Sequence, residues 1–148
     1  MYTTEDFETI QWHDNAIHGF RIVEGAENLG GTLVFDIDFI LEWLPSESGS
    51  LTFRIEPSAL TFHVVTDLVV SVDYASSTAA VQPMAIHEIH RAVITYPNGA
   101  TSYNWRIEIN WPPNAYFAFC ADGFTQEARR APVSSGRHCL SVAERGQS

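Results

Sequence analysis

Three carboxylates in one stretch of the chain are well placed to bind a cation or a basic partner. The stretch 33–43 alternates large apolar residues at odd positions with Asp36, Asp38 and Glu42 at even positions. On a strand, Asp36 and Asp38 share a face and lie close enough to bind one divalent cation or one arginine. A metal site needs at least three converging ligands, and a single strand supplies at most two neighbouring carboxylates. We therefore expect Asp36, Asp38 and Glu42 to form a partner-binding face and not a metal site.

Histidines supply the alternative, because a transition metal prefers imidazole to carboxylates alone. The segment 12–19 is the densest cluster of functional residue types in the chain. The alternative function is a small metal-dependent enzyme or ligand-binding β protein that uses His13, Asp14, Asp36 and Asp38, with His18 and His63 as further candidates.

The remaining combinations of reactive residues do not match known catalytic spacings. His87 and His90 are three residues apart, whereas the zinc protease motif needs two histidines four apart. Cys120 and Cys139 are separated by eighteen residues and lack the close pairing of a zinc knuckle. Cys120 also lies in an apolar run, where thiols are usually inert. We therefore predict no catalytic residue, no bound metal and no cofactor.

Acidic charge is concentrated in the first third of the chain. Residues 1–50 hold ten acidic residues and one arginine, a net charge of −9, while the remaining residues carry −1. Nucleic acid selects basic surfaces, so it is excluded as a partner. An uneven acidic field attracts a cationic protein, although acidity also serves solubility.

The ends and the apolar runs of the sequence bear on location. Residues 1–9 contain early acids and no apolar signal region, and no apolar run approaches the ~20 residues of a membrane span. We expect a cytoplasmic protein with no membrane partner and two free thiols.

Strand signals recur along the chain. Strict alternation predicts strands at 33–43 and 102–111, and further strands are expected at 19–23, 51–56, 60–74 and 116–121. The run 60–74 exceeds a usual strand length, which predicts a bulge or corner near Thr66 and Asp67. Residues 86–96 fit a helix at their start and a strand at their end, and Pro97–Gly99 predicts a hairpin turn.

These elements predict one all-β domain over residues 1–148, with a polar N-terminal segment at 1–11 and a polar C-terminal tail at 131–148. Strands that follow one another through turns favour an antiparallel β-sandwich, with a partly open β-barrel as the alternative. The apolar faces predict an aromatic core of Phe35, Phe39, Trp43, Phe53, Phe62, Trp105 and Trp111.

The order of apolar features in residues 51–122 resembles that of small bacterial β-domains. The features are Leu60-Thr-Phe62-His-Val64, Asp67-Leu68, Val72-Asp73, Ile86 and Ile89, a strand containing Trp105, and Phe117-Ala-Phe119. Some domains with this layout are immunity proteins, which bind and neutralise a bacterial toxin. The resemblance implies a protein-binding role and transfers no individual site residue.

Overall fold

The computed structural model describes residues 1–26, 30–45, 47–75 and 81–146, and most of them lie in antiparallel strands, as predicted. The elements are β1 (Tyr2–Thr3), the 3-10 helix η1 (Thr4–Thr9), β2 (Ala16–Val23), β3 (Gly31–Pro45), β4 (Leu51–Ser71), β5 (Met84–Thr95), β6 (Thr101–Trp111), β7 (Tyr116–Ala121), β8 (Gly123–Ala128) and β9 (Val133–Ser135). The ambiguous segment 86–96 is therefore strand and not helix.

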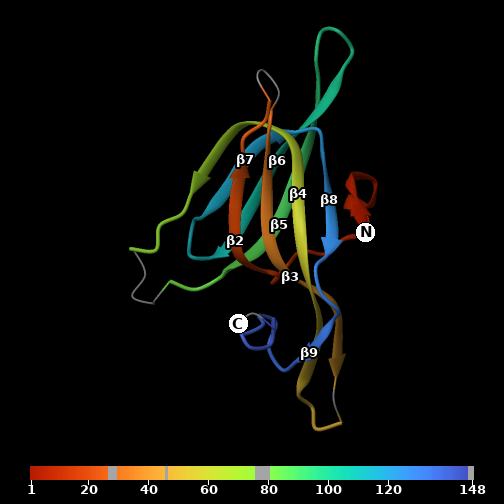
Figure 1. Cartoon of the computed structure of the whole chain (residues 1–148), viewed down its shortest axis with the longest axis vertical. Coiled ribbons are helices and arrows are strands. Elements are labelled where there is room, and N and C mark those ends of the chain that lie inside the picture. The colour runs from red at the N-terminus through yellow and green to blue at the C-terminus, as the bar shows by residue number, and fades with distance from the viewer. Residues whose placement is uncertain (27–29, 46, 76–80, 147–148) are drawn as a thin grey trace.

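The strands form one sheet whose pairings close into a ring (Figure 1). The ring runs β4-β3-β2-β5-β6-β7 and returns to β4, while β1, β8 and β9 lie outside it. Closure depends on a corner in β4, where Val64 and Asp67 have φ angles of 58° and 54°. Before the corner β4 pairs with β3 and β8, and beyond it with β7. The corner predicted near Thr66 and Asp67 is thus confirmed.

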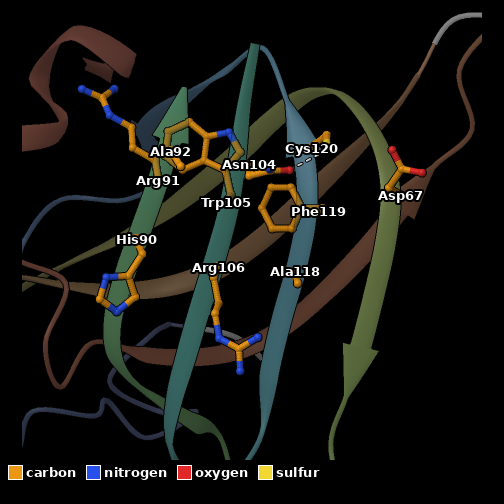
Figure 2. Close-up of a pocket in the computed structure, with 10 residues that line it drawn as sticks. All are labelled: Asp67, His90, Arg91, Ala92, Asn104, Trp105, Arg106, Ala118, Phe119 and Cys120. Atoms are coloured by element: carbon orange, nitrogen blue, oxygen red, sulfur yellow. Dashed lines mark hydrogen bonds between the residues drawn. The ribbon is translucent and has the colours of Figure 1, made fainter. Parts of the chain in front are cut away.

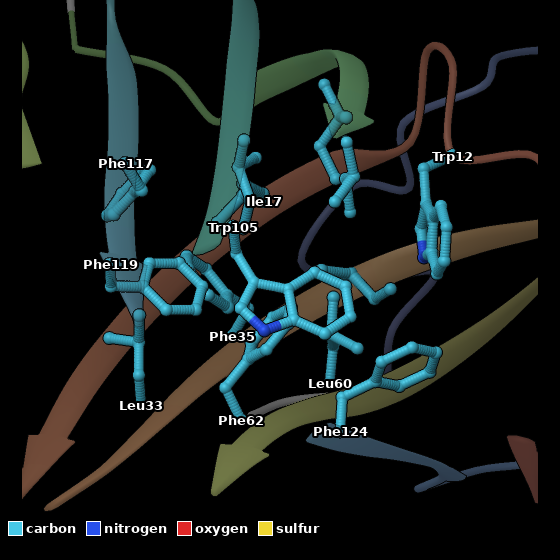
Figure 3. Packing of buried hydrophobic residues seen from close by; sticks show 14 of the residues in the cluster. Trp12, Ile17, Leu33, Phe35, Leu60, Phe62, Trp105, Phe117, Phe119 and Phe124 are labelled. Atoms are coloured by element: carbon cyan, nitrogen blue, oxygen red, sulfur yellow. The ribbon is translucent and has the colours of Figure 1, made fainter. Parts of the chain in front are cut away.

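Aromatic side chains fill the inside of the ring (Figure 3). Phe35 of β3 meets Phe117 of β7 with ring centroids 4.9 Å apart, and Phe62 of β4 meets Phe119 at 4.8 Å and Trp105 at 5.1 Å. Edge-to-face contacts of this kind add to the stabilisation from burial. Phe39 is 5% exposed, so its predicted burial is confirmed.

A bulge in β3 changes which face the later residues occupy. The register with β4 shifts between Ile40 and Glu42, so that Trp43 pairs with Phe53 on the outer face of the ring. Trp43 is 49% exposed, and its assignment to the core was wrong because the bulge breaks the strict alternation. Trp111 was also predicted in the core, but it is only half-buried. Its ring packs on that of Tyr74, with ring centroids 5.4 Å apart.

The C-terminal segment is part of the fold and not merely a polar tail. β9 pairs with β4 at the base of the β3–β4 hairpin. Beyond it, Leu140 is 2% exposed and packs in a small outer core with Ile40, Phe53 and Ile55. The segment therefore covers the outer face of β3 and β4, which the sequence pattern had left open to solvent.

Candidate functional site

The buried carboxylate of Asp38 is the centre of a polar cluster on the outer face of the ring. Asp38 is 0% exposed, although it lies on the face that the alternation assigned to solvent. Its Oδ2 accepts hydrogen bonds from the Leu140 amide at 2.8 Å and from His18 Nε2 at 2.6 Å, and its Oδ1 accepts one from Arg145. Every one of these partners lies outside β3, so Asp38 ties three parts of the chain together.

Arg145 joins the C-terminal segment to β3. One guanidinium nitrogen bonds Asp38 and the other bonds Asp36, and Arg145 is only 4% exposed. A buried pair of this kind repays its desolvation only when the charges are fully hydrogen-bonded. The two carboxylates therefore do share an arginine, one of the two possibilities that their spacing indicated.

His18 reaches the cluster because it sits on a β-bulge. Ile17 pairs with Ile37 and Gly19 pairs with Asp36, so His18 is the extra residue between two ladder pairs. Bulges of this kind redirect a side chain, and here the ring of His18 points to Asp38. Burial lowers the pKa of His18, but the hydrogen bonds with Asp38 and Cys139 and the charge of Asp38 outweigh it and raise the pKa from 6.5 to about 9.

Cys139 completes the cluster from the C-terminal segment. Its Sγ lies 4.0 Å from His18 Nε2, and one ligand atom from each of His18, Asp38 and Cys139 lies within 4.8 Å of the other two. A nucleophilic triad would use one imidazole nitrogen for the thiol and the other for the carboxylate. Here both acidic groups approach the same nitrogen, so the arrangement lacks the geometry of a cysteine nucleophile with its base.

The cluster changes the interpretation of the predicted acidic face. Two carboxylates face one guanidinium and one protonated imidazole, so their formal charges cancel, and Asp38 is inaccessible to any partner. The prediction of an exposed face containing Asp38 was therefore wrong, because the C-terminal segment covers it. Glu42 lies beyond the bulge, is exposed, and meets Arg54 at 3.7 Å.

The structure brings only part of the alternative site together. His18 joins Asp36 and Asp38, but the ring of His13 stacks edge-on against His87, and its Nδ1 bonds the His87 carbonyl oxygen at 3.0 Å.

The other two candidates also have partners outside the cluster. Asp14 lies 3.5 Å from His13 Nε2, and His63 bonds Thr125 at 3.0 Å. Within the described ranges, Asp14, His63 and His13 make no hydrogen bond or ion pair with the Asp38 cluster. His13, Asp14, Asp36 and Asp38 do not form one site.

Sequence reasoning missed Arg145, and it considered Cys139 only in combination with Cys120, not with His18 and Asp38. Arg145 is 107 positions from Asp38, and no spacing rule connects an arginine in a polar tail to a strand so distant. The available signal was the pair Leu140 and Val142, since an apolar residue in a polar tail indicates a point of attachment.

A shallow hollow lies on the outer face of β5, β6 and β7 (Figure 2). Its volume is about 380 Å³, and Asn104, Arg106 and Cys120 lie along it. Cys120 donates a hydrogen bond to Asn104 at 2.9 Å, while burial and the neighbouring Asp67 raise the pKa of its thiol. A thiol held in its protonated form is a poor nucleophile, so the hollow has no activated cysteine.

Exposed apolar side chains gather at the projecting end of the β3–β4 hairpin. Trp43, Leu44 and Leu51 are 49%, 40% and 47% exposed. In Figure 1 this hairpin extends well past the body of the ring, with β9 along its base. A second hollow, of about 320 Å³, runs from Trp43 to the N-terminal segment and includes His13.

Comparison with protein-family models, with curated proteins and with solved structures gives no match. In the part of the chain that the structure describes, no helix has the length and apolar character needed to cross a membrane.

Proposed function

We propose that this chain is a non-catalytic protein-binding domain that engages a cationic partner through the β3–β4 hairpin. The observation that carries the proposal is the exposed group Trp43, Leu44 and Leu51 on a projecting hairpin. Large apolar side chains that are held in solvent are typical of interaction surfaces, and tryptophan is enriched among residues that dominate binding energy.

The hairpin presents these residues in a defined arrangement. Trp43 pairs with Phe53 across the two strands, and their rings meet edge to face with centroids 5.0 Å apart. Phe53 is in turn buried with Leu140 beneath the C-terminal segment. Because the base of the hairpin is packed, Trp43 is already ordered, and a partner that contacts it would lose little side-chain entropy on binding.

Charge supports a basic partner. Glu42 and Glu47 are exposed beside the apolar group, and the whole chain carries a net charge of −10. An acidic field of this size raises the association rate of a cationic protein, and salt screens it. The resemblance to immunity proteins implies a toxin as the partner, and we propose that this toxin is basic. We propose that the interaction takes place in the cytoplasm, where Cys120 and Cys139 would remain reduced.

The test is affinity capture with matched variants of the immobilised chain, using an extract of the cells that express it. Trp43→Ser should weaken binding of the captured protein at least about 30-fold, as expected for a residue that contributes 2 kcal/mol or more. Val93→Ser is the control, because Val93 is 65% exposed on the β5–β6 hairpin. Raising NaCl from about 0.05 to about 0.5 M should weaken the same complex.

Two outcomes would overturn the proposal. Equal loss of binding in the Val93 and Trp43 variants would show that general surface apolarity, and not the hairpin, retains the protein. Sedimentation showing a dimer that Trp43→Ser dissociates would make the partner a second copy of the chain, which contradicts a cationic partner.

A further inference from the structure

We propose that His18, Asp38 and Cys139 form a binding site for a transition-metal dication of the Zn²⁺ type. The three residues come from the bulge of β2, the middle of β3 and the C-terminal segment. Their ligand atoms all lie within 4.8 Å of one another, which brings together residues up to 121 positions apart. This site does not include the hairpin residues Trp43, Leu44 and Leu51, so the metal-binding proposal is tested separately from the proposed protein-binding function.

The types of donor atom select the metal. The site offers one imidazole nitrogen, one thiolate sulfur and one carboxylate oxygen, all of which are established zinc ligands. Thiolate and imidazole favour Zn²⁺ and Co²⁺, whereas Mg²⁺ and Ca²⁺ prefer oxygen ligands only. Three protein ligands also leave a fourth tetrahedral position for water or another small ligand.

The distances from His18 Nε2 to Asp38 and to Cys139 are those of hydrogen-bonded groups that share a proton, and they lie close to the distances between ligands of one metal ion. Tetrahedral bonds to zinc separate nitrogen and oxygen ligands by about 3.3 Å, and nitrogen and sulfur ligands by about 3.5 Å. Here His18 Nε2 is 2.6 Å from Asp38 Oδ2 and 4.0 Å from Cys139 Sγ. On metal binding the nitrogen–oxygen distance must lengthen and the nitrogen–sulfur distance must shorten, each by less than about 1 Å. Metal binding would then displace the proton on His18 and the proton on Cys139.

The surroundings of Asp38 already provide the outer contacts of a metal ligand. Arg145 holds Oδ1, and the Leu140 amide also bonds Oδ2, so the carboxylate has a fixed orientation. Hydrogen-bonded carboxylates of this kind are typical of metal sites. Arg145 also neutralises Asp36, which leaves Asp38 and the thiolate to balance the charge of the metal. His18 keeps 17% of its side chain exposed, and Cys139 is also partly exposed, so two of the three ligands are accessible from solvent.

The experiment titrates the whole chain, freed of metal by a chelator, with Zn²⁺ by calorimetry and with Co²⁺ by absorption spectroscopy. We expect one equivalent of each, with a sulfur-to-cobalt charge-transfer band. Cys139→Ser should abolish the band and weaken Zn²⁺ binding at least about tenfold, and His18→Gln should weaken it similarly. Both substituted side chains are partly exposed, whereas Asp38 is buried and would endanger folding.

Matched controls are available in the same chain. Cys120→Ser removes the other cysteine, and His63→Gln removes a histidine whose side chain bonds Thr125, so both variants should bind as the wild type does. The proposal is overturned if the wild type binds no Zn²⁺, if Cys139→Ser keeps the charge-transfer band, or if Cys120→Ser loses it. Binding of Mg²⁺ or Ca²⁺ in place of Zn²⁺ would contradict the assigned donor set.

Discussion

The raised pKa of His18 predicts that the metal-free protein loses stability as the pH rises. His18 Nε2 donates to the buried Asp38 carboxylate at 2.6 Å, and its pKa rises from 6.5 to about 9 on folding. A group with a raised pKa in the folded state stabilises the protein fully below the unfolded pKa. This stabilisation is therefore complete below about pH 6.5 and is lost as the pH rises through about 9.

The size of the effect follows from the interval between the two pKa values. From 6.5 to about 9, at about 1.36 kcal/mol per pH unit, the interval corresponds to at most about 3.4 kcal/mol. Only 17% of the His18 side chain is exposed, so solvent screens the interaction with Asp38 little. This is a large fraction of the 5–15 kcal/mol that stabilises a typical domain.

The assay is urea unfolding of wild type and His18→Gln from pH 6 to 10 in the presence of a chelator. The stability of the wild type should fall relative to the variant across this range, because other titrating groups are common to both proteins. His63→Gln, which removes an exposed histidine, should follow the wild type. Parallel curves for wild type and His18→Gln between pH 6.5 and 9 would contradict this prediction, as would an NMR titration that gives His18 a pKa near 6.5.

Three further predictions concern the C-terminal segment, the core and the thiols. Arg145→Met removes a partner of the buried Asp38 and should lower the free energy of unfolding by about 3–5 kcal/mol. Arg137→Met, at an exposed site, should lower it by less than about 0.5 kcal/mol. Similar unfolding midpoints for the two variants would show that the ion pairs of Arg145 contribute little. Phe39→Ala removes a buried ring and should cost about 3–5 kcal/mol by chemical denaturation, so an unchanged midpoint would contradict its place in the core. Titration of the freshly isolated, denatured protein under non-reducing conditions should count two thiols, from Cys120 and Cys139; a count of zero would mean that they pair.

The sequence predicted those parts of the fold that depend on local periodicity. The alternation at 102–111 corresponds to β6, and the turn signal Pro97–Gly99 falls in the β5–β6 hairpin, where Gly99 has φ 85°. The alternation at 33–43 predicted the strand β3, and it assigned side chains to the correct face of the sheet as far as Ile40. The bulge that follows carries no glycine or proline signal, so the exposure of Trp43 could not be foreseen.

The candidate site depends on contacts between distant parts of the chain. Asp36 and Asp38 were recognised as a pair that could share an arginine, but the arginine lies 107 positions from Asp38. His18 is aimed at Asp38 by a bulge in β2. The adjacent Gly19 is the type of residue that marks a bulge, but it does not predict where the side chain of His18 points. Long-range pairing of this kind is set by packing of the C-terminal segment through Leu140, which periodicity does not encode.

The measurement that tests the proposed function most directly is photo-crosslinking from the hairpin. A benzophenone amino acid placed at Leu44 should crosslink one basic protein in the cells that express the chain, and Trp43→Ser in the same chain should abolish the product. The same probe at Val93, an exposed residue on the other hairpin, should give no such product. A product of equal yield from both positions, or none from Leu44, would contradict the assignment of the β3–β4 hairpin as the binding surface.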